Sequence, residues 1–232
     1  MSNVFLRQQF EQTVEETLIV LRQQNDVWKG LGTHPYIPNI DEVCERLEPT
    51  APAWPKGKDA YRSLRIRFGE GHNGMIQTFE AHAAAIKRVH AKFWRWDLLL
   101  SGEHPYQDKQ VDRLRLLAGN ETHHAVVEWV TIDDLSANRK RKDVTSVRGS
   151  QSLADEGLVL AWLFPKRVDA IDYDKWSAWF CAGYELSVPG HDDGPWRRVP
   201  CVHRCLYDGA TGLDAGWRSF DYSGCSVPPL RE

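Results

Sequence analysis

The 232-residue sequence predicts an α+β fold in which an N-terminal helical part with one long helix precedes a mostly antiparallel β-sheet. In residues 1–120, apolar side chains recur every three or four positions, the spacing of one face of a helix. Residues 121–232 instead hold short β-branched and aromatic segments separated by glycine and proline. Because helices come first and strands later, the order differs from alternating βαβ units. The two regions fit either two domains or one continuous domain.

The helical region begins with a predicted helix over residues 3–29, which Gly30 to Gly32 ends. Its apolar stripe consists of Leu6, Phe10, Val14, Leu18 and Leu21. Asn39 is expected to cap a short helix over residues 40–48. Three prolines make residues 49–58 the best candidate for a linker in this half of the chain.

Residues 61–68 alternate between apolar and polar side chains, which predicts a half-exposed strand. The outer face of this strand carries Ser63, Arg65 and Arg67. A glycine-rich turn over residues 69–74 leads into the longest predicted helix, residues 75–100. Another helix is predicted over residues 107–117.

Five segments of the second region are predicted as strands because they are short, β-branched or aromatic, and bounded by turn residues. They are residues 124–132, 143–149, 157–164, 179–188 and 196–207. The most apolar of them, residues 157–164, has eight residues and suits a buried strand.

Charged residues make up 26% of the chain and apolar residues 42%, which excludes a disordered chain or a coiled-coil rod. No apolar run approaches the roughly 18 residues of a membrane span, and the N-terminus lacks the pattern of a secretory signal. Five cysteines form an odd, scattered set, which suits a reducing compartment. We therefore expect a cytoplasmic protein without a membrane partner.

Gly69, Gly71 and Gly74 form a G-x-G-x-x-G pattern after a strand and before a helix. Such a turn can present backbone N–H groups and a helix N-terminus to an anion. The alternating strand before it and the lack of an acidic second strand argue against a dinucleotide site. A plain strand-to-helix turn and an anion-binding turn, with His72 as an acid–base candidate, both stay open.

A basic block lies between two predicted strands and consists of Arg139, Lys140, Arg141 and Lys142, with Arg148 nearby. Such a loop can follow a phosphate backbone by charge, whereas the alternative is an ordinary solvated loop. Arg65 and Arg67, with Arg197 and Arg198, could extend the cationic track. The excess of 19 arginines over 10 lysines suits phosphate contacts.

Ten tryptophans are the unusual feature of the composition, and four of them lie in two aromatic clusters. One cluster holds Trp94 and Trp96, and the other holds Trp176 and Trp179. Neighbouring residues cannot share one helix face, so part of these clusters is expected to form an exposed contact surface. Core packing is the alternative explanation for each tryptophan.

The case for a metal depends on Cys201, His203 and Cys205, with Cys225 further along. Zinc sites in proteins usually take two close ligand pairs, and here there is one, so buried structural thiols are the preferred interpretation. His82 and His90 lie eight residues apart on a predicted helix and cannot share an ion unaided. No metal and no cofactor is predicted.

The sequence thus favours a non-catalytic protein that binds RNA or DNA, or a protein subunit of a larger nucleoprotein assembly. One alternative is an enzyme that acts on a phosphorylated or nucleotide-like small molecule at the glycine-rich turn. Another is a protein–protein interaction module with an aromatic surface. None of the catalytic sequence motifs that would decide between them is present.

Overall fold

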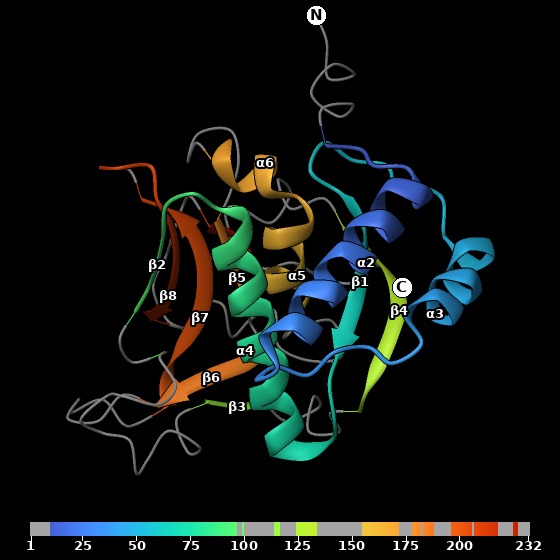
Figure 1. Ribbon diagram of the computed structural model, residues 1–232. Coiled ribbons are helices and arrows are strands. Elements are labelled where there is room, and N and C mark those ends of the chain that lie inside the picture. Colours follow the sequence, from blue (N-terminus) through green and yellow to red (C-terminus); the bar gives the residue numbers. More distant parts are fainter. Residues whose placement is uncertain are drawn as a thin grey trace, which may run out of the picture.

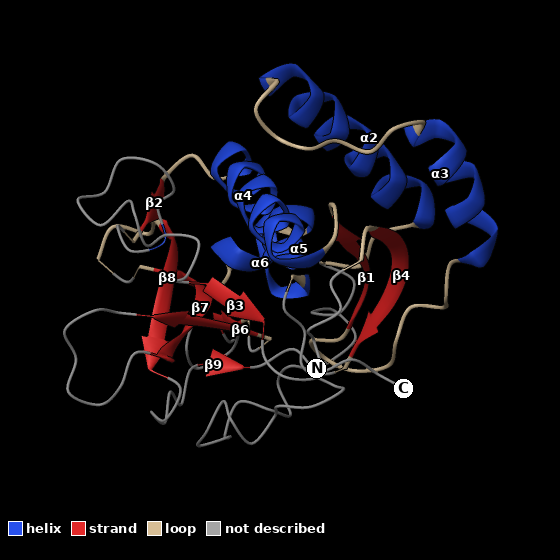
Figure 2. Ribbon diagram, turned by 90° about the horizontal axis from the view of Figure 1, so that it is seen from below, coloured by secondary structure: helices blue, strands red, loops and turns tan. Residues whose placement is uncertain are grey.

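The computed structural model describes residues 10–96, 99, 114–116, 124–133, 155–171, 178–181, 183–187, 196–205, 207–217 and 225–226. Within these residues the chain has the predicted α+β fold, with helices early and mostly antiparallel strands later (Figure 1). Helices α4 (Gly71–Val89) and α5 (Glu156–Leu163) lie between a two-stranded sheet and a larger sheet (Figure 2). No helix in the described ranges is long and apolar enough to cross a membrane.

Helix α2 (Val14–Leu31) begins eleven residues later than the predicted start at residue 3. Thr13 fixes this start, because its Oγ1 accepts a hydrogen bond from the Glu16 backbone N–H at 3.1 Å. The Glu16 carboxylate in turn accepts from the Thr13 backbone N–H at 2.7 Å, which completes a capping box. At the other end Gly32 takes a left-handed conformation with φ of 65°, so the predicted stop is confirmed.

Helix α3 (Ile40–Leu47) and the 3-10 turn η1 (Glu48–Thr50) follow where the short helix was predicted. Asn39 precedes α3, but its side chain makes no capping hydrogen bond, so that part of the prediction is wrong. The proline-rich segment after η1 packs against the core, since the Trp54 ring meets Tyr61 and Phe164 edge-on at about 6 Å between centroids.

Strands β1 (Tyr61–Arg67) and β4 (Val126–Ile132) pair antiparallel, with Leu64 opposite Trp129. Both strands were predicted, but the prediction that β1 is half-exposed is wrong. Ser63, on the predicted outer face, is fully buried, because α5 packs against that strand. Buried polar groups on this face therefore need partners inside the protein.

Helix α4 is the predicted long helix, but it begins at Gly71 and ends at Val89 rather than at residue 100. The aromatic run after it is extended, and Phe93–Arg95 forms strand β2, which pairs parallel to β8 (Thr211–Trp217). The prediction of helix here is wrong because the edge of the large sheet offers the chain a partner strand. Adjacent aromatic side chains then point to opposite faces.

Helix α5 corrects another prediction, because residues 157–164 were expected as a buried strand. Every residue of α5 is buried, so no polar face marks it as a helix in the sequence. The signals for a helix lie outside the apolar run: an acidic residue in the first turn and Pro165, which opens helix α6 (Pro165–Asp169).

The large sheet has seven strands within the described residues. Its central strand β7 (Trp196–Arg204) pairs antiparallel with β8 on one side and with β5 (Ala178–Phe180) and β6 (Tyr184–Ser187) on the other. The edges are β2, β3 (Leu114–Leu116) and β9 (Cys225–Ser226). The strand predicted over residues 179–188 is thus two strands, and part of the helix predicted over 107–117 is a strand. The strand predicted over 143–149 lies outside the described residues.

Tryptophans at the centre of the molecule join the helices to β1. The Trp28 ring meets Phe68 and Trp162 edge-on at 5.2 and 5.8 Å between centroids. Trp28 Nε1 also donates to the Ala81 carbonyl at 2.8 Å, which ties α2 to α4. Both tryptophans are essentially inaccessible, so core packing explains them.

Candidate functional site

The glycine-rich turn forms the predicted connection from a strand to a helix. Gly69 and Gly71 have positive φ angles of 68° and 61°, which favour glycine at both positions. Glycine is required at position 74 for a different reason: an added Cβ would lie 2.5 Å from the backbone carbonyl carbon of Gly69. The neighbour of β1 is antiparallel, so the turn lacks the parallel sheet of a dinucleotide fold. His72 is exposed at the start of α4.

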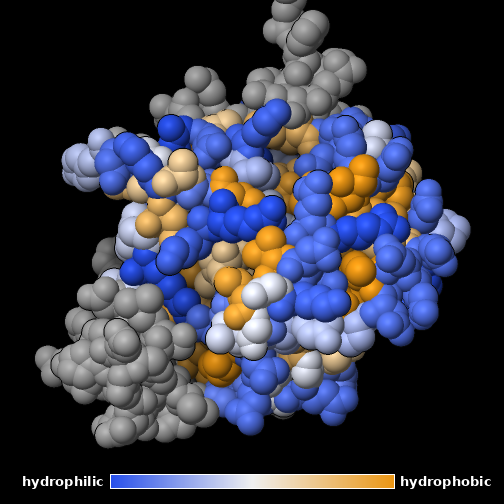
Figure 3. Space-filling model, viewed as in Figure 1, coloured by the Kyte–Doolittle hydropathy of each residue, from blue (hydrophilic) through white to orange (hydrophobic). Residues whose placement is uncertain are grey.

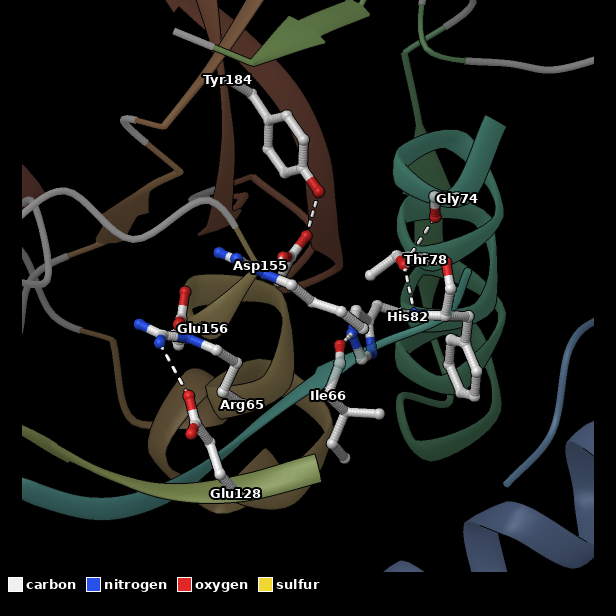
Figure 4. Close-up of polar contacts among 11 residues, drawn as sticks. Arg65, Ile66, Gly74, Thr78, His82, Glu128, Asp155, Glu156 and Tyr184 are labelled. Carbon is white, nitrogen blue, oxygen red and sulfur yellow. Dashed lines mark hydrogen bonds and ion pairs between the residues drawn. The ribbon is translucent and has the colours of Figure 1, made fainter. Parts of the chain in front are cut away.

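Arg65 and Arg67 were expected to extend a cationic track, and the structure corrects this. Arg65 donates to Glu128 at 2.8 Å and to Glu156, whose side chain is fully buried (Figure 4). Arg67 donates to the buried Asp155 at 2.7 Å. Their positive charges therefore balance carboxylates at the start of α5 rather than remain available to phosphates.

A cluster of buried polar groups surrounds these ion pairs. Burial raises the pKa of Glu156 and that of the Cys181 thiol above their ordinary values. Burial and the neighbouring Asp155 raise the pKa of Tyr184, whose hydroxyl donates to that carboxylate (Figure 4). Sequence reasoning missed this cluster because it assigned a strand to the segment. The acidic pair ahead of an apolar run, a helix-start signal, could have found it.

A second buried ion pair involves Arg167 of α6. Arg167 forms two hydrogen bonds to Asp59, at 2.9 and 2.7 Å, and its guanidinium lies 4.9 Å from the centroid of the Trp179 ring. Trp179 is fully buried, so the prediction that it belongs to an exposed contact surface is wrong. The pair instead anchors α6 to the segment before β1.

His82 on α4 and His90, the residue that follows α4, are core residues. His82 Nε2 lies 2.9 Å from the Ile66 carbonyl, and Trp162 Nε1 lies 3.2 Å from His82 Nδ1 (Figure 4 shows Ile66 and His82). These contacts fix the neutral tautomer with the proton on Nε2. His90 Nε2 contacts the Ala161 carbonyl at 3.1 Å. Each ring is thus used in packing.

Cys201 is buried, whereas Cys205 is partly exposed, and both are free thiols. The His203 ring lies 5.4 Å from the Trp94 ring between centroids, and its Nε2 lies 3.7 Å from Asp214 Oδ2. Among the described residues, no three His, Cys, Asp or Glu side chains are placed to hold a metal ion together. The side chain of Cys225 lies outside the description.

A groove of about 700 Å³ opens between the end of α2, the second half of α4 and strand β2. Its floor is apolar and includes Val27, Ala83 and Ala84, while β2 contributes Phe93 and Trp94. Figure 3 shows this face of the molecule, on which hydrophobic residues lie among strongly hydrophilic ones. The volume lies in the range of known small-molecule sites.

Residues of the neighbouring strands β7 and β8 confine the Trp94 side chain. In the β2–β8 register it lies opposite Gly212, and a Cβ on that glycine would come within 2.7 Å of the Trp94 ring. The His203 ring meets Trp94 edge-on. Trp96, two residues on, packs against the core with Arg198 5.2 Å from its ring centroid. Of the two predicted contact residues in this run, Trp94 therefore lines the groove, whereas Trp96 is partly buried and packs against the core.

The groove carries a net positive charge. Lys87 and Arg88 are exposed at the end of α4, and neither has a carboxylate partner among the residues that the structure describes. Arg88 donates to the Gln24 side chain at 3.0 Å, which orients its guanidinium. Arg95 and Glu80 also line the groove, but their charges cancel because Arg95 donates two hydrogen bonds to Glu80, at 2.7 and 2.6 Å.

The remaining predicted site residues lie outside the described part of the chain. They are Arg139, Lys140, Arg141, Lys142, Arg148 and Trp176, together with the side chain of Arg197. The basic block and Trp176 therefore stay predictions from the sequence.

A comparison with protein-family models, one with curated proteins and one with solved structures each found no match to this chain.

Proposed function

We propose that the protein binds single-stranded nucleic acid, without catalysing a reaction on it, in the groove between α2, α4 and β2. One observation carries the proposal: the half-buried aromatic residues Phe93 and Trp94 and the exposed cations Lys87 and Arg88 line one groove. Proteins that hold single strands combine a positive groove with aromatic side chains on which bases stack. A base can stack on one of these rings while phosphates face the end of α4.

The fixed position of the Trp94 side chain supports the proposal. A stacking residue that is already ordered costs little conformational entropy when a base binds. Trp94 is confined between Gly212 and His203, and the neighbouring Arg95 is fixed by Glu80. The groove is therefore largely preformed, as binding sites usually are.

Binding should depend on salt, because cations that contact phosphates release counterions from the strand. For a single strand, each contact adds about 0.7 to the magnitude of the slope of log affinity against log salt concentration. If Lys87 and Arg88 each contact a phosphate, the double substitution Lys87→Ala with Arg88→Ala should reduce that slope by about 1.4.

The experiment is a fluorescence-anisotropy titration of labelled ten-nucleotide oligouridylate and oligothymidylate at two salt concentrations. Arg46→Ala with Lys56→Ala is the matched control, because these two basic side chains are exposed and lie outside the groove lining. The proposal predicts a smaller salt slope for the groove variant alone. No binding by the wild type at low salt would refute it.

A nucleotide-like small molecule is the second candidate ligand, and the groove volume favours it. Adenosine monophosphate in the same titration separates the two. The second ligand class would be favoured if adenosine monophosphate displaced the ten-mer at a concentration close to the Kd of the ten-mer.

A further inference from the structure

The turn between β7 and β8 displays an unused aromatic residue. Tyr207 is fully exposed, at 100%, while the other large aromatic residues of the described ranges are at least half covered. Two hydrogen bonds join described residues of this turn: Cys205 N–H donates to the Ala210 carbonyl at 2.8 Å, and Gly209 N–H donates to the Cys205 carbonyl at 3.0 Å. The side chain is thus presented on a defined support.

This turn lies next to the groove. Lys92 Nζ donates to the carbonyl of Asp208, the residue after Tyr207, at 3.1 Å. The Thr211 N–H donates to the Lys92 carbonyl at 2.9 Å, so the turn and the start of β2 are joined along the backbone. Lys92 precedes Trp94 by two residues, which is about 7 Å along an extended chain at roughly 3.3 Å per residue.

The charge around the turn suits an anionic strand. Lys92 is exposed, and the Arg204 guanidinium lies beside Gly209, since a Cβ on that glycine would be 3.3 Å from Arg204 Nη2. The carboxylate of Asp208 is occupied by the turn, where it accepts from the Ala210 N–H at 3.0 Å. Two basic side chains therefore lie against the turn that carries the exposed Tyr207 ring, and a base that stacks on this ring would have cations near its phosphates.

We infer that Tyr207 is a second base-stacking residue and that the nucleic-acid track runs from the groove, past Lys92, onto the β7–β8 turn. The inference rests on the proposed function and adds the path that the bound strand follows and the minimum length of an oligonucleotide that contacts both residues. A strand that reaches both Trp94 and Tyr207 must be longer than one that fills the groove alone.

The test compares oligouridylates of two and ten nucleotides binding to the wild type, Tyr207→Ala and Tyr207→Phe. The inference predicts that Tyr207→Ala weakens binding of the ten-mer about 5- to 150-fold, the range of one lost stacking contact, and leaves the two-mer unchanged. Tyr207→Phe keeps the ring and should bind like the wild type. Tyr36→Ala is the matched control, because Tyr36 is also exposed and lies outside the groove lining.

The outcomes separate the two claims. If Trp94→Ala weakens both oligonucleotides but Tyr207→Ala weakens neither, the inference fails and the proposed function stands. If neither variant changes the affinity, both fail. Self-association that Tyr207→Ala abolishes, with unchanged affinity for the ten-mer, would overturn the inference in favour of a protein contact.

Discussion

Gly74→Ala should destabilise the protein, although glycine in a helix usually costs stability. The added Cβ would lie 2.5 Å from the Gly69 carbon, 2.8 Å from the Phe68 oxygen and 2.9 Å from the Gly69 oxygen. All three atoms belong to the backbone, so β1 and α4 would have to move apart. Overpacking of this kind costs about 1–3 kcal/mol, and we expect the upper end, about 3 kcal/mol, because no side chain can yield.

The gain in helix propensity offsets about 1 kcal/mol of that cost, which leaves a net loss of about 2 kcal/mol. For a chain of this length the loss corresponds to a drop of about 4–8 °C in Tm. Urea unfolding followed by circular dichroism measures the free energy, and a thermal scan measures Tm.

Gly30→Ala is the matched control within α2. Its Cβ would meet nothing within 4 Å, and its φ angle is ordinary, so the same chemical change should stabilise the protein by about 0.4–1 kcal/mol. Opposite signs for the two variants are the expected result. A Gly74→Ala protein as stable as the wild type would refute the close approach of the strand and the helix.

Three further predictions concern the buried groups. Arg67→Met should lower the free energy of unfolding by about 3–5 kcal/mol in urea titrations, because it leaves the buried Asp155 carboxylate without its cation; adding Asp155→Leu should recover part of the loss. The pKa of Glu156 is raised in the folded state, so its stabilising contribution is complete below the unfolded value near 4.5 and decreases as pH rises through the folded value. The Tm of Glu156→Gln relative to wild type should therefore increase from pH 4 upward, and a difference independent of pH would contradict this assignment. In the native protein a thiol reagent should modify Cys205 and spare the buried Cys181, as peptide mass mapping can check.

The parts of the fold with a one-sided apolar pattern could be predicted from the sequence. The stripe of α4 gave the right element type because this helix has one face toward the core, and the β-branched and aromatic content of residues 124–132 correctly predicted β4. Helix α5 could not be recognised in this way, since all of its residues are buried and its apolar run carries no period. The failure at β2 has another cause, because a strand at residues 93–95 depends on β8, more than a hundred residues away.

The candidate site was only partly predictable for the same reason. Trp94 stood out as an unusual aromatic residue, and the structure brings it into a groove with Lys87 and Arg88. Those two cations lie in an ordinary helical sequence that gives no sign of the groove. Arg65 and Arg67 looked available in the sequence, but their carboxylate partners are 63 to 91 residues away and come from α5 and β4.

The affinity of Trp94→Ala for a ten-nucleotide oligouridylate, measured beside that of the wild type, tests the proposed binding groove most directly. A lost stacking contact of about 1–3 kcal/mol predicts a 5- to 150-fold weaker complex, with far-ultraviolet circular dichroism that matches the folded wild type. Equal affinity of the two folded proteins would contradict the assignment of the groove as a nucleic-acid site.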